Sequence, residues 1–152
     1  MGGTGISGLS LDPPLIIPDS LEAGTANTVG IASLNEGIKW TMKHSKELHA
    51  KYKKLQKLLV DELKQMPKII IYGVENGVIL FNIDKMPSSE VGDILSNDYG
   101  ICIRSGLHCA PLVHVHLGTH TSGAVRVSIG ANNTTRDIEK LLSAITEITQ
   151  KS

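Results

Sequence analysis

Two short aliphatic segments, residues 68–73 and 77–83, constrain the fold of this chain more than any other feature. Both are rich in β-branched residues, and only Val74, Glu75 and Asn76 lie between them. Strand-like runs joined by so short a link are typical of a β-hairpin. The sequence therefore predicts an antiparallel pair of strands in the middle of the chain.

Helical periodicity precedes and follows this hairpin. Apolar residues recur at helical spacing from Thr28 to about Met66, and Pro67 ends the pattern. The spacing fits one bent helix, or two helices with a break at residues 44–45. A further helix is predicted over residues 87–100, where a glycine stops it.

The last third of the chain predicts two more strands and a final helix. We expect strands at residues 101–104 and 124–129, with a loop at residues 105–111 after the first of them. Thr134 and Asp137 have capping-box spacing, and an apolar stripe follows them at helical intervals. The element order α-β-β-α-β-(α)-β-α predicts an α+β fold, with a small, mostly antiparallel sheet covered on one face by helices.

The composition narrows the classes of function. The 152 residues suit one modest domain, and 15 basic residues balance 15 acidic residues, so we expect no nucleic-acid partner and no membrane partner. Two cysteines and six histidines show no repeating ligand pattern, which favours a reducing compartment over a disulfide scaffold. Because the sequence shows neither a signal-peptide pattern nor a membrane-spanning apolar run, we expect a soluble, cytoplasmic protein.

The segment 103–111, Ile-Arg-Ser-Gly-Leu-His-Cys-Ala-Pro, is the most informative for chemistry. Cys109 shares it with Arg104 and His108, whose charge or donors are suited to stabilise a thiolate nucleophile. The simpler interpretation of a cysteine is a small buried hydrophobe. We expect that role for Cys102, which lies between two isoleucines in a predicted strand.

Two further segments carry candidate binding residues. Arg126 is the charged residue of the predicted strand 124–129, where it either faces solvent or clamps a carboxylate through its bidentate guanidinium. Residues 22–28, Glu-Ala-Gly-Thr-Ala-Asn-Thr, precede the first predicted helix. A hydroxyl and free backbone N–H groups at a helix start bind anions such as phosphate. Alternatively, Asn27 or Thr28 serves only as the helix N-cap.

Together these three segments resemble the cysteine desulfurase branch of the class V aminotransferase family. The resemblance is carried by Arg-x-Gly-x-His-Cys-Ala, by Gly-x-Val-Arg-Val-Ser-Ile-Gly downstream, and by Leu-Glu-x-Gly-Thr-x-Asn upstream. Residues 2–5, Gly-Gly-Thr-Gly, and the final amphipathic helix are also similar to that family. The resemblance implies that residues 29–152 are the C-terminal small domain of a fold-type I enzyme. Residues 1–28 would then be the tail of a large domain that holds pyridoxal phosphate.

The resemblance also implies a reaction and the roles of individual residues. With pyridoxal phosphate as cofactor, Cys109 would take sulfur from L-cysteine, or selenium from selenocysteine, and alanine would be released. Arg126 would bind the substrate carboxylate, and Arg104 and His108 would line the same site. Thr25 would reach the phosphate of the cofactor in the partner subunit of a homodimer. A sulfur-acceptor protein is a further expected partner.

Two features depart from the family pattern. Ala26 stands where the family usually has proline, and no lysine among the 152 residues directly follows a histidine, as the family's cofactor lysine does. The nearest approximation, Lys43-His44-Ser45-Lys46, has the wrong order. We therefore expect the cofactor lysine in a preceding large domain. The isolated chain is expected to bind no pyridoxal phosphate and to be inactive.

Two other functions stay open. A folded domain that self-associates without catalysis would use apolar surface left by a missing domain. A zinc site formed by Cys109, His114, His116 and His120 is the other, although its spacing is poor. On a helix, His114 and His116 would point apart. The simpler interpretation places most of these histidines at the surface or in loops.

Overall fold

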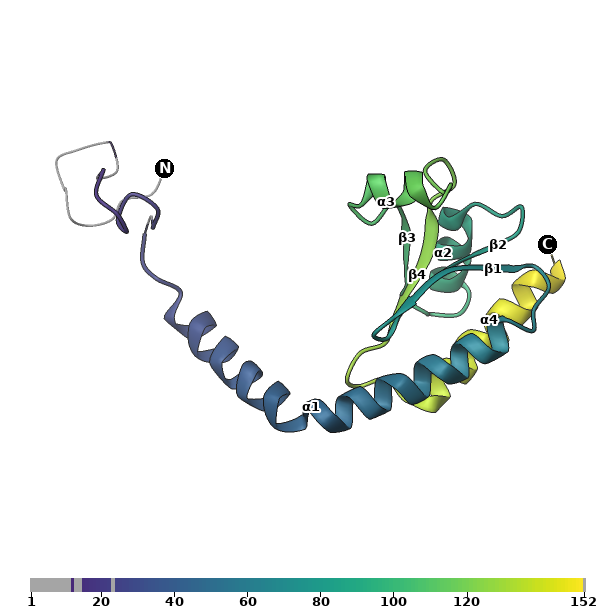
Figure 1. Cartoon of the computed structure of the whole chain (residues 1–152), viewed down its shortest axis with the longest axis horizontal. Coiled ribbons are helices and arrows are strands. Elements are labelled where there is room, and N and C mark those ends of the chain that lie inside the picture. The colour runs from purple at the N-terminus through teal and green to yellow at the C-terminus, as the bar shows by residue number, and fades with distance from the viewer. Residues whose placement is uncertain (1–11, 13–14, 23, 152) are drawn as a thin grey trace. The chain divides into compact units, whose positions relative to one another are not determined.

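The computed structural model describes residues 12, 15–22 and 24–151, which belong to two units divided between Ser45 and Lys46. The Gly-Gly-Thr-Gly segment at residues 2–5 lies outside the described residues. None of the described helices is both long enough and apolar enough to cross a membrane. In chain order the elements are α1 (Thr28–Leu63), β1 (Ile69–Glu75), β2 (Val78–Ile83), α2 (Ser88–Asn97), β3 (Arg104–Gly106), α3 (Pro111–His116), β4 (Ala124–Ser128) and α4 (Thr135–Lys151) (Figure 1).

The first unit contains the start of α1. Asn27 caps this helix, because its Oδ1 accepts a hydrogen bond from the backbone N–H of Gly30 at 2.9 Å. α1 then continues as one helix to Leu63, which decides between the one-helix and two-helix interpretations. The large apolar side chains of α1 in this unit are exposed, namely Val29, Ile31, Leu34, Ile38, Trp40 and Met42.

The second unit is built on a four-stranded sheet in the order β1-β2-β4-β3, and every neighbouring pair is antiparallel. β1 and β2 form the predicted hairpin, and its turn has left-handed backbone at Asn76 and Gly77, with φ of 45° and 83°. β4 lies between β2 and β3 and so joins the two halves of the sheet.

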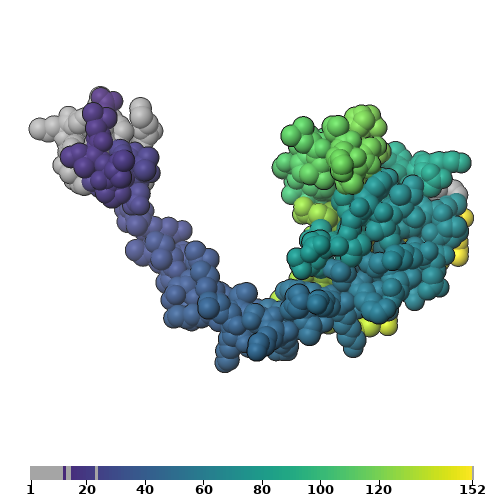
Figure 2. Space-filling view, viewed as in Figure 1, coloured from purple at the N-terminus to yellow at the C-terminus, as the bar shows by residue number. Residues whose placement is uncertain are grey.

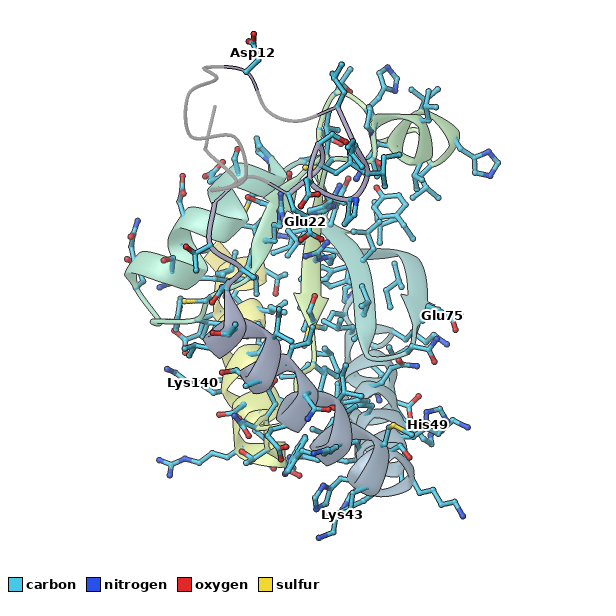
Figure 3. The ribbon with its side chains drawn as sticks, turned by 90° about the vertical axis from the view of Figure 1, so that its left-hand side faces the viewer. Asp12, Glu22, Lys43, His49, Glu75 and Lys140 are labelled. Atoms are coloured by element: carbon cyan, nitrogen blue, oxygen red, sulfur yellow. The ribbon has the colours of Figure 1, made fainter. Side chains whose placement is uncertain are left out.

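Helices cover one face of this sheet. Alternate residues of β2 and β4 point to that face, where each large apolar side chain that is buried stabilises the fold by about 1.5–3 kcal/mol. The predicted α+β arrangement is thereby confirmed. Glu75 at the end of β1 and Lys140 on α4 point away from the core (Figure 3). The core consists of Leu55, Leu59, Val60, Leu63, Ile79, Phe81, Ile83, Val91, Leu95, Val125, Val127, Ile129, Ile138, Leu141, Ala144, Ile145 and Ile148.

The strand predicted at residues 101–104 is displaced along the chain, since β3 covers residues 104–106 instead. Ile101 and Ile103 pack against the core from outside the strand, and Cys102 between them is exposed. The expectation of a buried Cys102 is therefore wrong. Its two neighbours take the inward positions, and alternation along the extended segment sends Cys102 outward.

A capping interaction fixes the start of α4, as the spacing of Thr134 and Asp137 predicted. The Asp137 carboxylate accepts hydrogen bonds from the Thr134 backbone N–H at 2.8 Å and from its hydroxyl at 3.1 Å. These bonds, the backbone one foremost, lower the pKa of Asp137 below its ordinary value. The helix therefore begins just after β4 and returns across the sheet.

Candidate active-site loop

Cys109 is presented by a tight turn between β3 and α3, at one end of the second unit (Figure 2, green). Gly106, His108 and Cys109 have left-handed backbone, with φ of 99°, 53° and 58°. The N–H of Ala110 donates to the carbonyl of Leu107 at 2.9 Å and closes the turn. Such backbone costs a residue other than glycine about 1–3 kcal/mol, so it persists only where surrounding contacts enforce it. Cys109 is exposed at this turn.

Close backbone contact holds the turn against the start of β4. A Cβ at Gly123 (φ 64°) would lie 2.7 Å from Gly106 Cα and 2.6 Å from Ser88 Oγ, so only glycine permits this approach. The buried Asn82 side chain donates to the carbonyl of Gly123 at 2.9 Å and accepts from the N–H of Val125 at 3.3 Å. Neither Gly123 nor Asn82 was predicted from the sequence, although a glycine beside a strand is a signal of close backbone approach.

The structure brings Arg104 and Cys109 together. Arg104 Nη2 donates a hydrogen bond to Cys109 Sγ at 3.6 Å. Arg104 begins β3, and the turn brings the thiol back toward that end of the strand. A guanidinium in this position stabilises negative charge on the sulfur, which is the form of cysteine that acts as a nucleophile.

Arg126 is also in this group, because it lies directly opposite Arg104 in the β3–β4 pair. Opposite residues of an antiparallel pair share one face of the sheet. That face is opposite to the one on which Val125 and Val127 point into the core. Arg126 is half-buried, and its buried Nε has no hydrogen-bond partner among the described residues. Two guanidinium groups on one face, one with a buried donor that lacks a described partner, have the chemistry that an anion accepts hydrogen bonds from.

His108 connects the turn to α3. Its Nε2 lies 3.3 Å from the carbonyl oxygen of Arg104, and its Nδ1 lies 3.3 Å from Nε2 of His114. Burial lowers the pKa of His108 below its ordinary value, and the charges of Arg126, His114 and Arg104 act in the same direction. The hydrogen bond to the Arg104 carbonyl opposes them. The ring is therefore neutral at neutral pH.

The remaining histidines near the turn do not gather around one point. His114 is buried on α3, whereas His116 on the same helix and His120 after it are exposed. Within the described ranges, no group of three or more His, Cys, Asp or Glu side chains is arranged to hold a metal ion. The burial of His114 was not foreseen from the sequence.

Thr25 lies in the first unit, whereas the other predicted site residues lie in the second. It is exposed two positions before the N-cap Asn27. Gly24 beside it has φ of 84°, and nothing lies within 4 Å of the place that a Cβ would occupy. The Thr25 hydroxyl is therefore accessible to a group that approaches from outside the unit.

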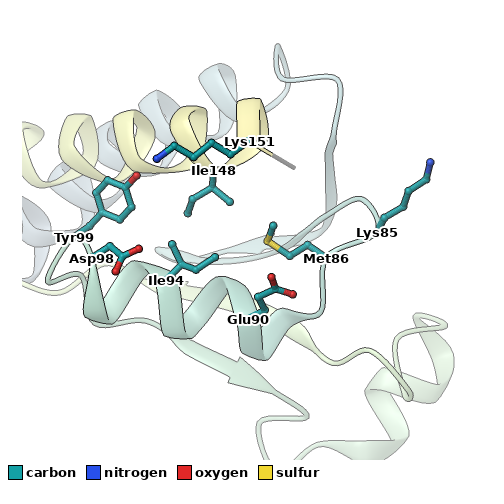
Figure 4. A pocket seen from close by; sticks show the side chains of 8 residues that line it. All are labelled: Lys85, Met86, Glu90, Ile94, Asp98, Tyr99, Ile148 and Lys151. Atoms are coloured by element: carbon teal, nitrogen blue, oxygen red, sulfur yellow. The ribbon is translucent and has the colours of Figure 1, made fainter.

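A separate pocket of about 400 Å³ lies between α2 and the end of α4 (Figure 4). At its edge the Tyr99 hydroxyl donates to the Glu147 carboxylate at 2.9 Å. None of the predicted site residues lines it, so it is not part of the Cys109 site. Its lining consists of Lys85, Met86, Glu90, Ile94, Asp98, Tyr99, Ile148 and Lys151.

Comparison with known protein families shows to which family the chain belongs. A family model described as aminotransferase class-V matches residues 3–141. The chain belongs to the class V aminotransferase family. The resemblance predicted from the three sequence motifs is thereby confirmed.

Curated proteins with similar sequences include cysteine desulfurases from Salmonella newport (strain SL254) and Salmonella typhi. Each is 33% identical to this chain over 153 aligned residues. The match covers 97% of this chain and 37% of each relative. The chain therefore spans little more than a third of the length of these curated relatives.

Solved structures of cysteine desulfurases have the same fold in the matched region. The S-sulfonic acid form of CsdA from Escherichia coli gives a TM-score of 0.78 at 26% identity, over 88% of this chain and 33% of that one. An apo cysteine desulfurase from Thermococcus onnurineus NA1 gives 0.77 at 30% identity, over 89% of this chain and 34% of that one. The α+β fold predicted for this class V aminotransferase chain is thus shared with cysteine desulfurases.

Proposed function

We propose that this chain is the sulfur-accepting part of a cysteine desulfurase, in which Cys109 takes sulfur from L-cysteine as a persulfide. The observation that carries the proposal is the contact between Arg104 Nη2 and Cys109 Sγ on an exposed, left-handed turn. The similarity of nearly the whole chain to cysteine desulfurases supports it. A cysteine with only a structural role would have no need of a strained turn and a cationic donor.

Arg126 is proposed to bind the carboxylate of L-cysteine, with Arg104 beside it. The buried Nε of Arg126, which lacks a partner among the described residues, would donate to one carboxylate oxygen. A guanidinium presents its donors in the geometry that a carboxylate accepts from, so the pair binds in a defined orientation. Satisfying a buried donor of this kind recovers about 1–3 kcal/mol. This interaction holds the substrate next to the turn that carries Cys109.

The atoms and electrons of the sulfur transfer balance between the two thiols. Cys109, as a thiolate, attacks the sulfur of L-cysteine, and an S–S bond forms while the bond from that sulfur to the substrate Cβ breaks. The electron pair of the broken bond stays with the carbon. One thiol proton ends on the methyl group of L-alanine and the other on the persulfide, so no external oxidant is needed. Arg104 contributes by stabilising negative charge on Cys109 Sγ before the attack.

Pyridoxal phosphate is the cofactor that the proposal implies. When bound, it supplies an electron sink that makes the C–S bond of the substrate breakable. The exposed Thr25 hydroxyl and the open space at Gly24 fit a phosphate that approaches from the partner subunit of a homodimer. We place residues 1–28 in the tail of a large cofactor domain and residues 29–152 in the small domain. The cofactor lysine then belongs to the large domain, since no lysine follows a histidine among the 152 residues.

The exposure of Cys109 also suits delivery of the sulfur to an acceptor protein. Such transfer proceeds by thiol exchange, which a reducing cytoplasm permits. Cys109 and Arg126 would serve selenocysteine by the same contacts. We propose L-cysteine as the substrate because the relatives are cysteine desulfurases.

One observation favours a second candidate function, a domain that self-associates without catalysis. Apolar residues such as Ile31, Leu34 and Ile38 are exposed on α1 in the first unit. A contiguous apolar surface on a soluble protein is typical of an interaction site. Size-exclusion chromatography of the chain and of an Ile31→Ser, Ile38→Ser double variant tests this. A dimer that the substitutions dissociate, together with an absence of sulfur transfer, would favour the second candidate.

The test of the proposed function is a desulfurase assay on the full-length gene product that contains this chain. With pyridoxal phosphate and L-cysteine, we expect alanine formation and the addition of one sulfur atom to Cys109, detected by mass spectrometry. Cys109→Ser should abolish both. Cys102→Ser is the matched control, because Cys102 is also exposed, and it should leave both unchanged. Sulfur on Cys102 instead, or full alanine formation by Cys109→Ser, would contradict the proposal.

A further inference from the structure

We propose that His114 and Thr119 are positioning residues for sulfur transfer. They fix the tautomer of His108, and His108 in turn holds the turn that presents Cys109. The inference rests on the proposed function of Cys109, but its structural part can be tested without catalysis. Nothing in the similarity to cysteine desulfurases assigns a role to either residue.

A continuous chain of hydrogen bonds links these residues. His114 is 1% exposed, and its Nδ1 lies 2.8 Å from the hydroxyl oxygen of Thr119, which is also 1% exposed. Its Nε2 lies 3.3 Å from Nδ1 of His108, and Nε2 of His108 lies 3.3 Å from the carbonyl oxygen of Arg104. The two rings are tilted by 46°, so they meet through their nitrogens rather than face to face. Every nitrogen of both rings is used.

The carbonyl acceptor at one end sets the direction of every hydrogen bond between Arg104, His108, His114 and Thr119. The Arg104 carbonyl only accepts, so Nε2 of His108 must carry the hydrogen. A neutral imidazole has a single N–H, and the lowered pKa of His108 keeps its ring neutral. Nδ1 of His108 therefore accepts from His114 Nε2–H, and in the neutral form of His114 its Nδ1 accepts from the Thr119 hydroxyl. The proposed arrangement thus holds both histidines as Nε2–H tautomers.

The direction of these hydrogen bonds affects the position of Cys109, because the turn that carries it is strained. His108 and Cys109 both have left-handed backbone, and the bond from the His108 ring to Arg104 ties the turn back to the strand before it. Without the donor on His114, Nδ1 of His108 would lose its partner, and only the 3.3 Å bond to the Arg104 carbonyl would hold the ring. The turn would then relax, and Cys109 Sγ would lose its alignment with the Arg104 guanidinium.

The burial of His114 supports a role beyond packing. An apolar side chain would fill the same space without the cost of removing two ring nitrogens from water. That cost is offset only because both nitrogens have partners, Thr119 on one side and His108 on the other. The hydroxyl of Thr119 likewise has its described partner in His114. The buried side chains of His114 and Thr119 therefore form one hydrogen-bonded network with His108.

Protonation of His108 would reverse the direction of the hydrogen bonds between His108, His114 and Thr119. With hydrogens on both nitrogens, His108 would donate to His114 Nε2, and His114 would donate through Nδ1 to Thr119. The charged groups that face His108 are Arg104 from β3 and Arg126 from β4, with His114 facing it from α3. Burial of His108 foremost, and the positive charges beside it, oppose its protonation, so the hydrogen-bond direction of the neutral ring is favoured at neutral pH.

The first experiment determines the tautomers of His108 and His114 directly in the 152-residue protein. Nitrogen-15 NMR of the imidazole rings should show Nε2 protonated and Nδ1 unprotonated in both His108 and His114. Thr119→Val should remove the donor to His114 and allow its other tautomer, and Thr119→Ser should restore the original pattern. A hydrogen on Nδ1 of His108 in the original chain at neutral pH would overturn the inference.

The second experiment measures the rate at which the Cys109 thiol is alkylated. In His114→Leu and Thr119→Val, alkylation of Cys109 by iodoacetamide should slow by roughly two- to tenfold, as the loss of one hydrogen bond implies. His114→Gln, whose amide both donates and accepts, and Thr119→Ser should recover the rate. Cys102 provides the internal reference, since it is exposed and lies outside the turn. His116→Gln, an exposed position on the same helix, is the matched control and should change nothing.

The outcomes separate this inference from the proposed function. A slowing as large in His116→Gln, or no recovery in the conservative variants, would overturn the positioning role. If His114→Leu does not fold, the paired Thr119→Val and Thr119→Ser variants decide. In the full-length gene product, Thr119→Val should lower kcat but leave KM for L-cysteine unchanged, because Arg126 carries binding. Correct tautomers in a protein whose Cys109 takes no sulfur would refute the proposed function and leave only the structural part of the inference standing, namely that His114 and Thr119 hold His108 and the turn.

Discussion

Arg104 and Arg126 occupy directly opposite positions on β3 and β4, on the face of the sheet opposite to the one where Val125 and Val127 join the core. Like charges in such a pair destabilise the sheet by roughly 0.2–1 kcal/mol, so the arrangement has a cost in the free protein. A carboxylate between them would remove that cost and satisfy the buried Nε of Arg126. Under the proposed function, the pair therefore lowers the stability of the free protein and gains it back when a carboxylate is bound.

Replacing Arg126 by methionine tests whether the Arg104–Arg126 pair destabilises the free protein. Methionine retains much of the side-chain volume and removes the charge and the unpartnered donor. We expect the free energy of unfolding in urea to stay within about 1 kcal/mol of the original value, with any change in the stabilising direction. Arg136→Met, at an exposed position on α4, is the control for loss of a surface arginine. A loss well beyond about 1 kcal/mol specific to Arg126 would show that its role is structural.

The contact between Arg104 and Cys109 predicts a difference between the two cysteines. Both are exposed, so access does not distinguish them. Cys109 should alkylate roughly three- to tenfold faster than Cys102 at neutral pH, because Arg104 stabilises negative charge on Sγ. Peptide mass spectrometry after brief alkylation measures both rates in one sample. Arg104→Gln should reduce the ratio toward one, and equal rates in the original chain would remove the argument for an activated thiol.

The lowered pKa of His108 predicts a pH dependence of stability. Because the folded chain binds this proton less readily than the unfolded chain, protonation favours unfolding. The stability is complete above the unfolded value of about 6.5 and declines as the pH falls from there toward the folded pKa. Between about pH 7 and about pH 5, the original chain should lose more stability than His108→Gln. Other histidines titrate in both proteins, so a difference of the opposite sign would show that His108 is not held neutral.

Much of the fold could be predicted because its elements carry local signals. The hairpin, the long helix and the cap formed by Asp137 and Thr134 each depend on residues close together in sequence. The limits of β3 could not be predicted in this way. Ile101 and Ile103 look like a strand because they alternate toward the core, but the Ile101 N–H bonds to the carbonyl of Leu95 rather than to a neighbouring strand.

The sequence could nominate residues for the candidate site but not their arrangement. The segment 103–111 identified Cys109 as a candidate from its own composition. The position of Arg126 opposite Arg104 depends on the register of two distant strands, which no local pattern specifies. The burial of His114 depends on how a six-residue helix packs against the turn, and its short sequence has too little periodicity to reveal a buried side.

The absence of a lysine directly after a histidine predicts how this chain responds to pyridoxal phosphate. After addition of the cofactor and reduction with borohydride, intact mass should show no stoichiometric adduct at a single lysine. A low background spread over exposed lysines is expected, since an aldehyde reacts with any accessible amine. Lys43→Arg with Lys46→Arg, which removes the segment nearest to the family's pattern, should leave that background nearly unchanged. A stoichiometric adduct at one lysine would mean that the chain holds its own cofactor site. The assignment of the cofactor lysine to a separate large domain would then be wrong.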